Sequence, residues 1–218
     1  MIGLGPRLPP GTRVVVATRN AGKVAEFRRL LGASGWAVLL LDALPGGSAA
    51  AWEEDADTYL ANATIKALAV AAATGEVALA DDSGVELDAF GGWPGVRSAR
   101  WLGPDASDAD RVQAVRARVA ALDAGRRGAV FACALALAAP GPGGQPVLLT
   151  TAESRVRGRL LPEPRGTAGF GYDPLFVPEG HATTMAELAP AAKDRLSHRG
   201  RAVTALLQQL APAPGPPR

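Results

Sequence analysis

The stretch RVVVATRNAGKVAEFRRLL, residues 13–31, decides the fold class. It begins with a β-branched run over Arg13–Thr18, which is typical of a buried strand. Over Gly22–Leu31, apolar side chains recur on one helical face and charged side chains occupy the other. A strand that runs directly into an amphipathic helix predicts a βα unit.

Further elements follow this unit along the chain. The patterns predict strands at Ala37–Leu41, Val77–Ala80 and Val85–Asp88, an alanine-rich helix at Thr58–Ala73, a helix after the N-cap Ser107, paired strands at Ala129–Ala139 and Pro146–Arg157, and a last helix through Leu210. The segment Asp42–Asp57 is predicted to be a loop. Because strands and helices alternate early and a hairpin comes late, we expect an α/β fold with a mixed sheet.

The length of 218 residues suits one large domain or two small lobes around a cleft. Apolar residues make up 48% of the chain, which is enough for a sizeable core. We expect one two-lobed domain over residues 13–210, preceded by a disordered extension at 1–12 and followed by a disordered Pro-rich tail at 211–218.

Charge and cysteine content restrict the class of protein. The net charge is only +2, so the chain lacks the basic excess expected when nucleic acid is the main partner. The single cysteine, Cys133, lies in an apolar run and is predicted to be a buried structural thiol. One cysteine allows no internal disulfide, which suits a reducing cytoplasm. No apolar run approaches the roughly 20 residues of a membrane span, so we expect no membrane partner.

The first candidate site is the turn between the first strand and its helix, which contains Thr18, Arg19, Asn20, Ala21, Gly22 and Lys23. Helix N-terminal amides attract anions, Gly22 permits close approach of the backbone, and Lys23 adds a charge for phosphate. An ordinary βα turn with Asn20 as N-cap is the alternative interpretation.

Acidic residues supply the second candidate site. Asp81 and Asp82 follow an apolar strand, and because adjacent strand residues point to opposite faces, only one of them can enter a given site. The pair Glu53-Glu54 lies in the acidic loop. Carboxylate oxygens are natural ligands of Mg²⁺, although a solvated loop or a helix cap would also explain such residues.

Three further groups contain candidate binding residues. Asn62 and Lys66 are four residues apart and share a helix face. Glycines around Phe170, in the string GFGYDP, would let a flat ligand approach the backbone, although a tight turn is equally compatible. The string KDRLSHRG, residues 193–200, gathers basic groups in one turn before the last helix, or on a solvated helix start.

Together these strings resemble the inosine triphosphate pyrophosphatase family, the non-standard purine nucleoside triphosphate diphosphatases. The matching segments are ATRNAGKVAEF, the acidic EE, NATIKA, ADDSGVELDAFGGWPGVRSARW, GFGYDPLF and KDRLSHRGRA, from about Val14 to about Ala202. The resemblance implies an elongated mixed β-sheet with flanking helices, two lobes around a nucleotide cleft, and a cytoplasmic homodimer. It also implies Mg²⁺-dependent hydrolysis of ITP, dITP and XTP to the monophosphate and pyrophosphate.

The resemblance also implies residue roles. Asp82 would be the catalytic proton acceptor, and Glu53 and Asp82 would hold Mg²⁺. Substrate would be bound by Thr18, Arg19, Asn20, Ala21, Gly22, Lys23, Lys66 and Ser83 at the phosphates, and by Phe170, Gly171, Tyr172, Asp173, Lys193, His198 and Arg199 at the base.

Two positions depart from the pattern of the family. Arg19 stands where a small or neutral residue is common, so it either adds a phosphate contact or points outward. Ala61 replaces a usual Glu, which leaves the Mg²⁺ shell open. Two other functions remain as alternatives: a related pyrophosphatase for unusual pyrimidine or other nucleotides, and a nucleotide-binding module without catalysis. The carboxylates Glu53 and Asp82 distinguish these, because a binding module needs no metal-and-water site.

Overall fold

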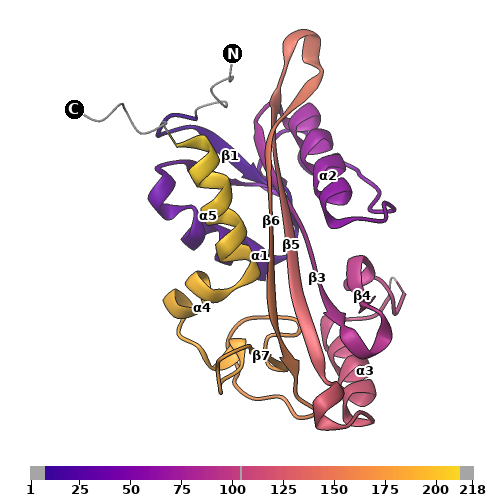
Figure 1. The fold of residues 1–218 in the computed structure, drawn as a ribbon. Helices are drawn as coiled ribbons and strands as arrows, with labels where there is room; N and C mark the ends of the chain where they lie inside the picture. The colour runs from indigo at the N-terminus through magenta and orange to yellow at the C-terminus, as the bar shows by residue number, and fades with distance from the viewer. Residues whose placement is uncertain (1–7, 104, 212–218) are drawn as a thin grey trace, which may run out of the picture. The chain divides into compact units, whose positions relative to one another are not determined.

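The computed structural model describes residues 8–103 and 105–211. Figure 1 shows the elements, which alternate early and end in two helices. The strands are β1 (Arg13–Val16), β2 (Ala37–Leu40), β3 (Val77–Leu87), β4 (Trp93–Pro94), β5 (Gly128–Pro140), β6 (Pro146–Leu160) and β7 (Phe176–Pro178). The α-helices are α1 (Ala21–Leu30), α2 (Tyr59–Thr74), α3 (Asp108–Ala120), α4 (Pro190–Leu196) and α5 (His198–Leu210).

Within the described residues, the strands form one seven-stranded sheet in the order β2-β1-β3-β5-β6-β7, with β4 paired to β3. β1 pairs in parallel with both β2 and β3, whereas β3–β4 and β6–β7 are antiparallel. The sheet is therefore mixed, and the predicted α/β class is confirmed.

The chain divides into two compact units, consistent with the expected two lobes. Among the described residues, the first contains 8–81, 134–153 and 202–211, and the second contains 82–103, 105–133 and 154–201. Strand β3 passes from the first unit to the second between Asp81 and Asp82. The nucleotide cleft expected between the lobes stays a prediction.

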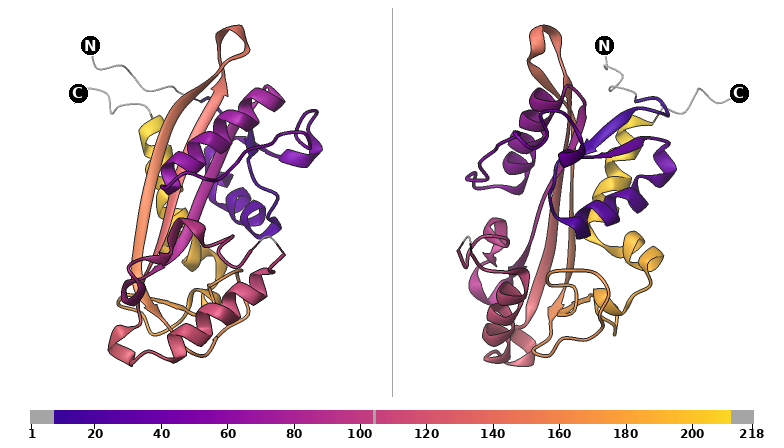
Figure 2. Two further views of the ribbon diagram at one scale, coloured as in Figure 1. Left: turned by 90° about the vertical axis from the view of Figure 1, so that its right-hand side faces the viewer. Right: turned by 180° about the vertical axis from the view of Figure 1, so that it is seen from behind.

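The first unit packs helices on both faces of its strands, with α2 on one side and α1 on the other (Figures 1 and 2). Helix α2 starts at its N-cap Thr58, whose hydroxyl accepts a hydrogen bond from the Ala61 amide at 3.1 Å. It ends at Gly75, which adopts a left-handed φ of 67°. The small side chains of Ala63 and Ala67 are fully buried, so this helix can approach the sheet closely.

The second unit has its own apolar core. Val115 and Val119 of α3 pack there with strand residues that include Val85, and the rings of Phe131 and Phe176 stack at 3.9 Å. Cys133 is buried, as predicted. No helix in the described part of the chain has the length and apolar character needed to cross a membrane.

The structure corrects two element boundaries. The predicted strands Val77–Ala80 and Val85–Asp88 are a single strand, β3, which continues through Asp81-Asp82-Ser83-Gly84. His198 and Arg199 do not precede the last helix but form its first turn. Ser197 carries the cap, since its Oγ accepts from the Gly200 amide at 3.0 Å.

The predicted terminal extensions fall mostly outside the described residues, at 1–7 and 212–218. Residues 8–12 of the N-terminal extension are described and make hydrogen bonds. The Gly11 amide donates to the Gly35 carbonyl at 2.7 Å, and the Thr12 hydroxyl donates to the Pro9 carbonyl at 2.6 Å.

Candidate active site

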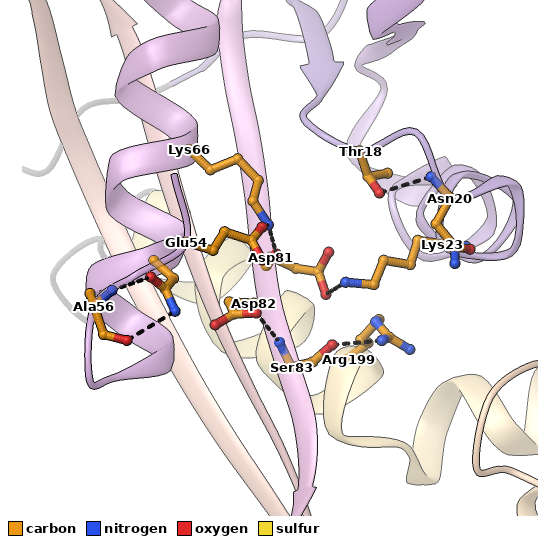
Figure 3. Close-up of polar contacts among 11 residues, drawn as sticks. Thr18, Asn20, Lys23, Glu54, Ala56, Lys66, Asp81, Asp82, Ser83 and Arg199 are labelled. Atoms are coloured by element: carbon orange, nitrogen blue, oxygen red, sulfur yellow. Dashed lines mark hydrogen bonds and ion pairs between the residues drawn. The ribbon is translucent and has the colours of Figure 1, made fainter. Parts of the chain in front are cut away.

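The turn after β1 has the predicted strand-to-helix geometry. Asn20 is the N-cap of α1, and its Oδ1 accepts from the Lys23 amide at 3.0 Å. The Thr18 hydroxyl accepts from the Asn20 amide at 3.2 Å, which fixes the entry to the helix (Figure 3). Ala21 and Gly22 begin the helix, so the turn presents helix N-terminal amides that favour an anion.

Lys23 is held by the first of the two strand carboxylates. Its Nζ lies 3.1 Å from Asp81 Oδ2, and the side chains are 19% and 1% exposed (Figure 3). A buried carboxylate needs a cationic partner, and Lys23 supplies it. The sequence assigned Asp81 no role of its own, and its ion pair with Lys23 supplies one in the structure.

Lys66 joins the same unit from α2. Its Nζ donates to the Asp81 carbonyl oxygen at 3.0 Å and forms an ion pair with Glu54 (Figure 3). The Lys66 side chain is only 6% exposed, so its charge is desolvated and depends on these oxygens. The first unit therefore contains two largely buried lysines paired with carboxylates.

The structure distinguishes the two residues of the acidic pair. Glu53 is exposed, whereas Glu54 is half-buried and turns toward Lys66. Two residues after Glu54 in the chain, the loop is held by Asn62, whose Oδ1 accepts from the Ala56 amide at 3.1 Å. Glu54 is thus a candidate site residue to which the sequence assigned no role of its own. The role of Glu53 as metal ligand stays a prediction.

Asp82, the expected proton acceptor, is the first residue of the second unit. It leaves β3 on the face opposite Asp81 and is only 5% exposed. Its Oδ1 accepts from the Ser83 amide at 3.1 Å. The Ser83 hydroxyl in turn accepts from Arg199 Nη2 at 2.7 Å, which links β3 to the start of α5 (Figure 3).

The glycine-flanked Phe170 lies against two cations. Lys193 Nζ is 5.1 Å from the ring centroid, and the Arg199 guanidinium carbon is 4.9 Å from it. Asp173 organises this group, because its Oδ2 accepts from Lys193 Nζ at 2.7 Å and from the Phe170 amide at 2.9 Å. Gly169 has a φ of 79°, and a Cβ there would lie 2.2 Å from Asp173 Oδ2.

Tyr172 is half-buried and His198 is buried, and both side chains contact other residues of the second unit. The Tyr172 hydroxyl donates to the Ser98 carbonyl at 3.2 Å and accepts from Trp101 Nε1 at 3.4 Å. Burial raises the pKa of Tyr172, so the phenol stays protonated and keeps its donor. His198 is 5% exposed, and its ring lies 4.8 Å from that of Phe131. Gly171 has a φ of 56°, which favours glycine at this turn.

Arg19 points toward the loop at residues 42–52. Its Nε lies 3.2 Å from Asp42 Oδ1, and Nη2 donates to the carbonyl oxygens of Gly47 and Ala50, each at 3.2 Å. The structure therefore shows Arg19 bound to this loop. Binding of phosphate by Arg19 stays a prediction.

The donor set fits Mg²⁺ that arrives with nucleotide phosphates. Among the described residues, no three His, Cys, Asp or Glu side chains gather as a preformed metal site. Mg²⁺ in nucleotide enzymes needs only one or two carboxylates, because phosphates and water complete its shell. Carboxylates of the kind that such an ion prefers are present in each unit, Glu53 and Glu54 in the first and Asp82 in the second.

Comparison with known proteins places these residues in a family. The model of the Ham1 family matches residues 14–209. A dITP/XTP pyrophosphatase of Frankia alni is 49% identical over 195 residues, which cover 87% of this chain and 93% of the relative. A protein of the same name from Symbiobacterium thermophilum is 46% identical and covers 91% and 94%.

Solved structures agree with these relatives. A HAM1 protein from Coxiella burnetii matches with a TM-score of 0.75 at 37% identity, over 91% of this chain and 98% of that one. A nucleoside-triphosphatase, or dITP/XTP pyrophosphatase, from Mycobacterium abscessus matches with a TM-score of 0.64 at 42% identity, over 90% and 99%. The family model covers nearly all of the described residues, and the chain belongs to the Ham1 family.

Proposed function

We propose that this protein hydrolyses non-standard purine nucleoside triphosphates, with ITP, dITP and XTP as substrates, to the monophosphate and pyrophosphate. The relatives at 46–49% identity are named dITP/XTP pyrophosphatases, which supports the substrate class. Removal of such nucleotides from the nucleotide pool is the corresponding cellular role.

The observation that carries the proposal is the pairing of buried lysines with carboxylates in the first unit. Lys23 is held by Asp81, and Lys66 by Glu54 and the Asp81 carbonyl. Lys23 adds its charge to the N-terminal turn of α1, and Lys66 contributes a buried cation from α2. Cations and helix N-terminal amides both favour phosphate groups. The carboxylates keep the lysines in place before a substrate arrives, so little reorganisation is needed on binding.

The chemistry follows from these positions. Hydrolysis of a phosphoanhydride requires charge neutralisation and an oriented water more than covalent participation. Lys23 and Lys66 would offset the charge that develops on the pyrophosphate leaving group. The Asp82 carboxylate would orient the attacking water and accept its proton. Mg²⁺, for which Asp82 is a candidate ligand, would supply further neutralisation of the phosphate oxygens.

The second unit supports selection of the base. Phe170 offers an aromatic face, and Lys193 and Arg199 are hydrogen-bond donors beside it. A donor matches the 6-keto oxygen of hypoxanthine or xanthine. The 6-amino group of adenine would instead set donor against donor, at a cost of about 1–3 kcal/mol for each buried group left unpaired.

A panel assay tests the proposal. Purified protein is incubated with ITP, XTP, dITP, ATP, GTP and UTP, with Mg²⁺ or with EDTA, and the nucleotide products are separated by anion exchange. We expect monophosphates from the first three, much less from ATP, whose 6-amino group would face the donors, and none in EDTA. GTP has the same 6-keto oxygen as ITP, so the donors alone do not exclude it. Comparable turnover of ATP, or full activity in EDTA, would contradict the proposal.

Asp82→Asn adds a test of the proton acceptor. The amide keeps the shape of the side chain but loses the charge, so turnover should fall by at least about 10²-fold, the typical contribution of a general base. Asp88→Asn is a matched control, because Asp88 is a partly exposed residue directly after the same strand and pairs with Arg157 at 2.8 Å. Equal activity of the two variants would show that the proton acceptor lies elsewhere. The homodimer and the cytoplasmic location expected from the sequence stay predictions.

A further inference from the structure

Arg19 connects the phosphate-binding turn with the loop that carries the acidic pair. It directly follows Thr18, and its Nη2 donates to three loop carbonyls, those of Gly47 at 3.2 Å, Ser48 at 3.4 Å and Ala50 at 3.2 Å. The guanidinium also lies 5.1 Å from the ring centroid of Trp52. Residues 47–52 are thus tied to the turn just before Glu53.

The start of the loop is held by close backbone packing. A Cβ on Gly46, whose φ is 78°, would lie 2.2 Å from the Ala73 carbonyl oxygen at the end of α2. A Cβ on Gly47 would lie 1.8 Å from the Leu41 carbonyl oxygen. Both glycines let the backbone pack where no side chain fits, so this end of the loop is fixed without Arg19.

In the middle of the loop Ala50 is buried, whereas its neighbours Ser48, Ala49 and Ala51 are exposed. A cavity of about 510 Å³ lies there, lined by Arg19, Asp42, Trp52 and residues 48–51. Side chains beside a hollow lose packing contacts on that side. Besides the backbone hydrogen bond from the Ala50 amide to the Gly47 carbonyl at 3.3 Å, the hydrogen bonds from Arg19 connect this stretch to the turn after β1.

We propose that Arg19 is a positioning residue that holds residues 47–52 against the phosphate-binding turn and thereby fixes Glu53-Glu54 for the metal-dependent step. The inference rests on the proposed function for its kinetic consequence. The proposal predicts that a small or neutral residue cannot replace Arg19 in this chain.

The contacts of Arg19 require two donor nitrogens that point in different directions. Nε serves Asp42 while Nη2 serves backbone carbonyls, which a guanidinium can do and a single ammonium cannot. The Asp42 contact contributes little, because Arg19 and Asp42 are 45% and 60% exposed and solvent screens the pair. Arg19→Lys should thus restore only part of the function lost in Arg19→Gln, and Asp42→Asn should be nearly neutral.

The test combines hydrogen–deuterium exchange with kinetics on the full-length protein. In Arg19→Gln, amides of residues 48–54 should exchange at least about fivefold faster, because local opening becomes easier. The turnover number should fall about five- to tenfold and the Mg²⁺ concentration for half-maximal rate should rise about threefold, as expected for misplaced ligands. KM for ITP should change little.

Arg13→Gln is the matched control, because Arg13 is also a partly exposed arginine of the first unit and pairs with Glu76 at 2.7 Å. It should leave loop exchange and Mg²⁺ dependence unchanged. Unchanged exchange in Arg19→Gln would overturn the proposal, and so would a raised KM for every triphosphate without faster exchange, since Arg19 would then bind phosphate. If wild-type protein hydrolyses no purine triphosphate, the proposed function has failed, while the exchange comparison still decides whether Arg19 holds the loop.

Discussion

The buried ion pair between Lys193 and Asp173 gives the sharpest stability prediction. Lys193 Nζ lies 2.7 Å from Asp173 Oδ2, and each side chain is 6% exposed. In Lys193→Met the carboxylate keeps the Phe170 amide but loses its cation. An uncompensated buried charge costs about 3–5 kcal/mol. For a chain of this size, that loss corresponds to a decrease in Tm of roughly 6–20 °C.

A double-mutant cycle separates the charge from the shape. Asp173→Asn keeps an acceptor for the Phe170 amide but leaves Lys193 buried without a carboxylate, so it should also be strongly destabilised. Combining both substitutions removes both charges, and the double variant should recover to within about 1–2 kcal/mol of the wild type. Urea unfolding measures all four proteins. Additive losses, or single variants within about 1 kcal/mol of wild type, would refute the reasoning.

Three other predictions concern the site. Arg199→Ala should lower kcat/KM for ITP and XTP about one to two powers of ten more than for ATP, because it removes a charged hydrogen bond to the base. Lys23→Ala is the control and should lower kcat/KM for all triphosphates by a similar factor. An equal loss on ITP and ATP in Arg199→Ala would mean that Arg199 does not contact the base. Glu54→Gln should lower the melting temperature more than Glu53→Gln, since only Glu54 pairs with the buried Lys66, and the reverse order in thermal unfolding would contradict this geometry. Gly169→Ala should impair ITP binding, measured calorimetrically with the Ca²⁺ salt, because a Cβ at φ 79° would lie 2.2 Å from Asp173 Oδ2. Unaltered affinity would argue against a role of this turn in binding.

Much of the fold could be predicted because its signals are local. Apolar periodicity identified most helices and strands, and Ser107 caps α3 as predicted. Thr58, predicted as the first residue of its helix, is the N-cap of α2, and Asn20 caps α1 as in the alternative interpretation of that turn. The segment Asp81–Gly84 was the exception, since Asp, Ser and Gly are depleted in strands and suggested a break. Pairing within the sheet overrode this local preference and kept β3 continuous.

The site was predictable in composition but not in orientation. Glu53 and Glu54 are neighbours in a loop without periodicity, and only the three-dimensional position of Lys66 distinguishes them. The partner of Lys23 is Asp81, far along the chain, so no local pattern could reveal that contact. The start of α5 could have been found from Ser197, a favoured N-cap type directly before His198.

The products of ITP hydrolysis test the central claim most directly. Phosphorus NMR of a reaction with Mg²⁺ resolves pyrophosphate, orthophosphate and each nucleotide as they appear. The account predicts IMP and pyrophosphate in equal amounts from the earliest time point, with no IDP, because the site is proposed to cut between the α- and β-phosphates. Orthophosphate and IDP appearing first would contradict it, since that outcome places the cut at the terminal phosphate.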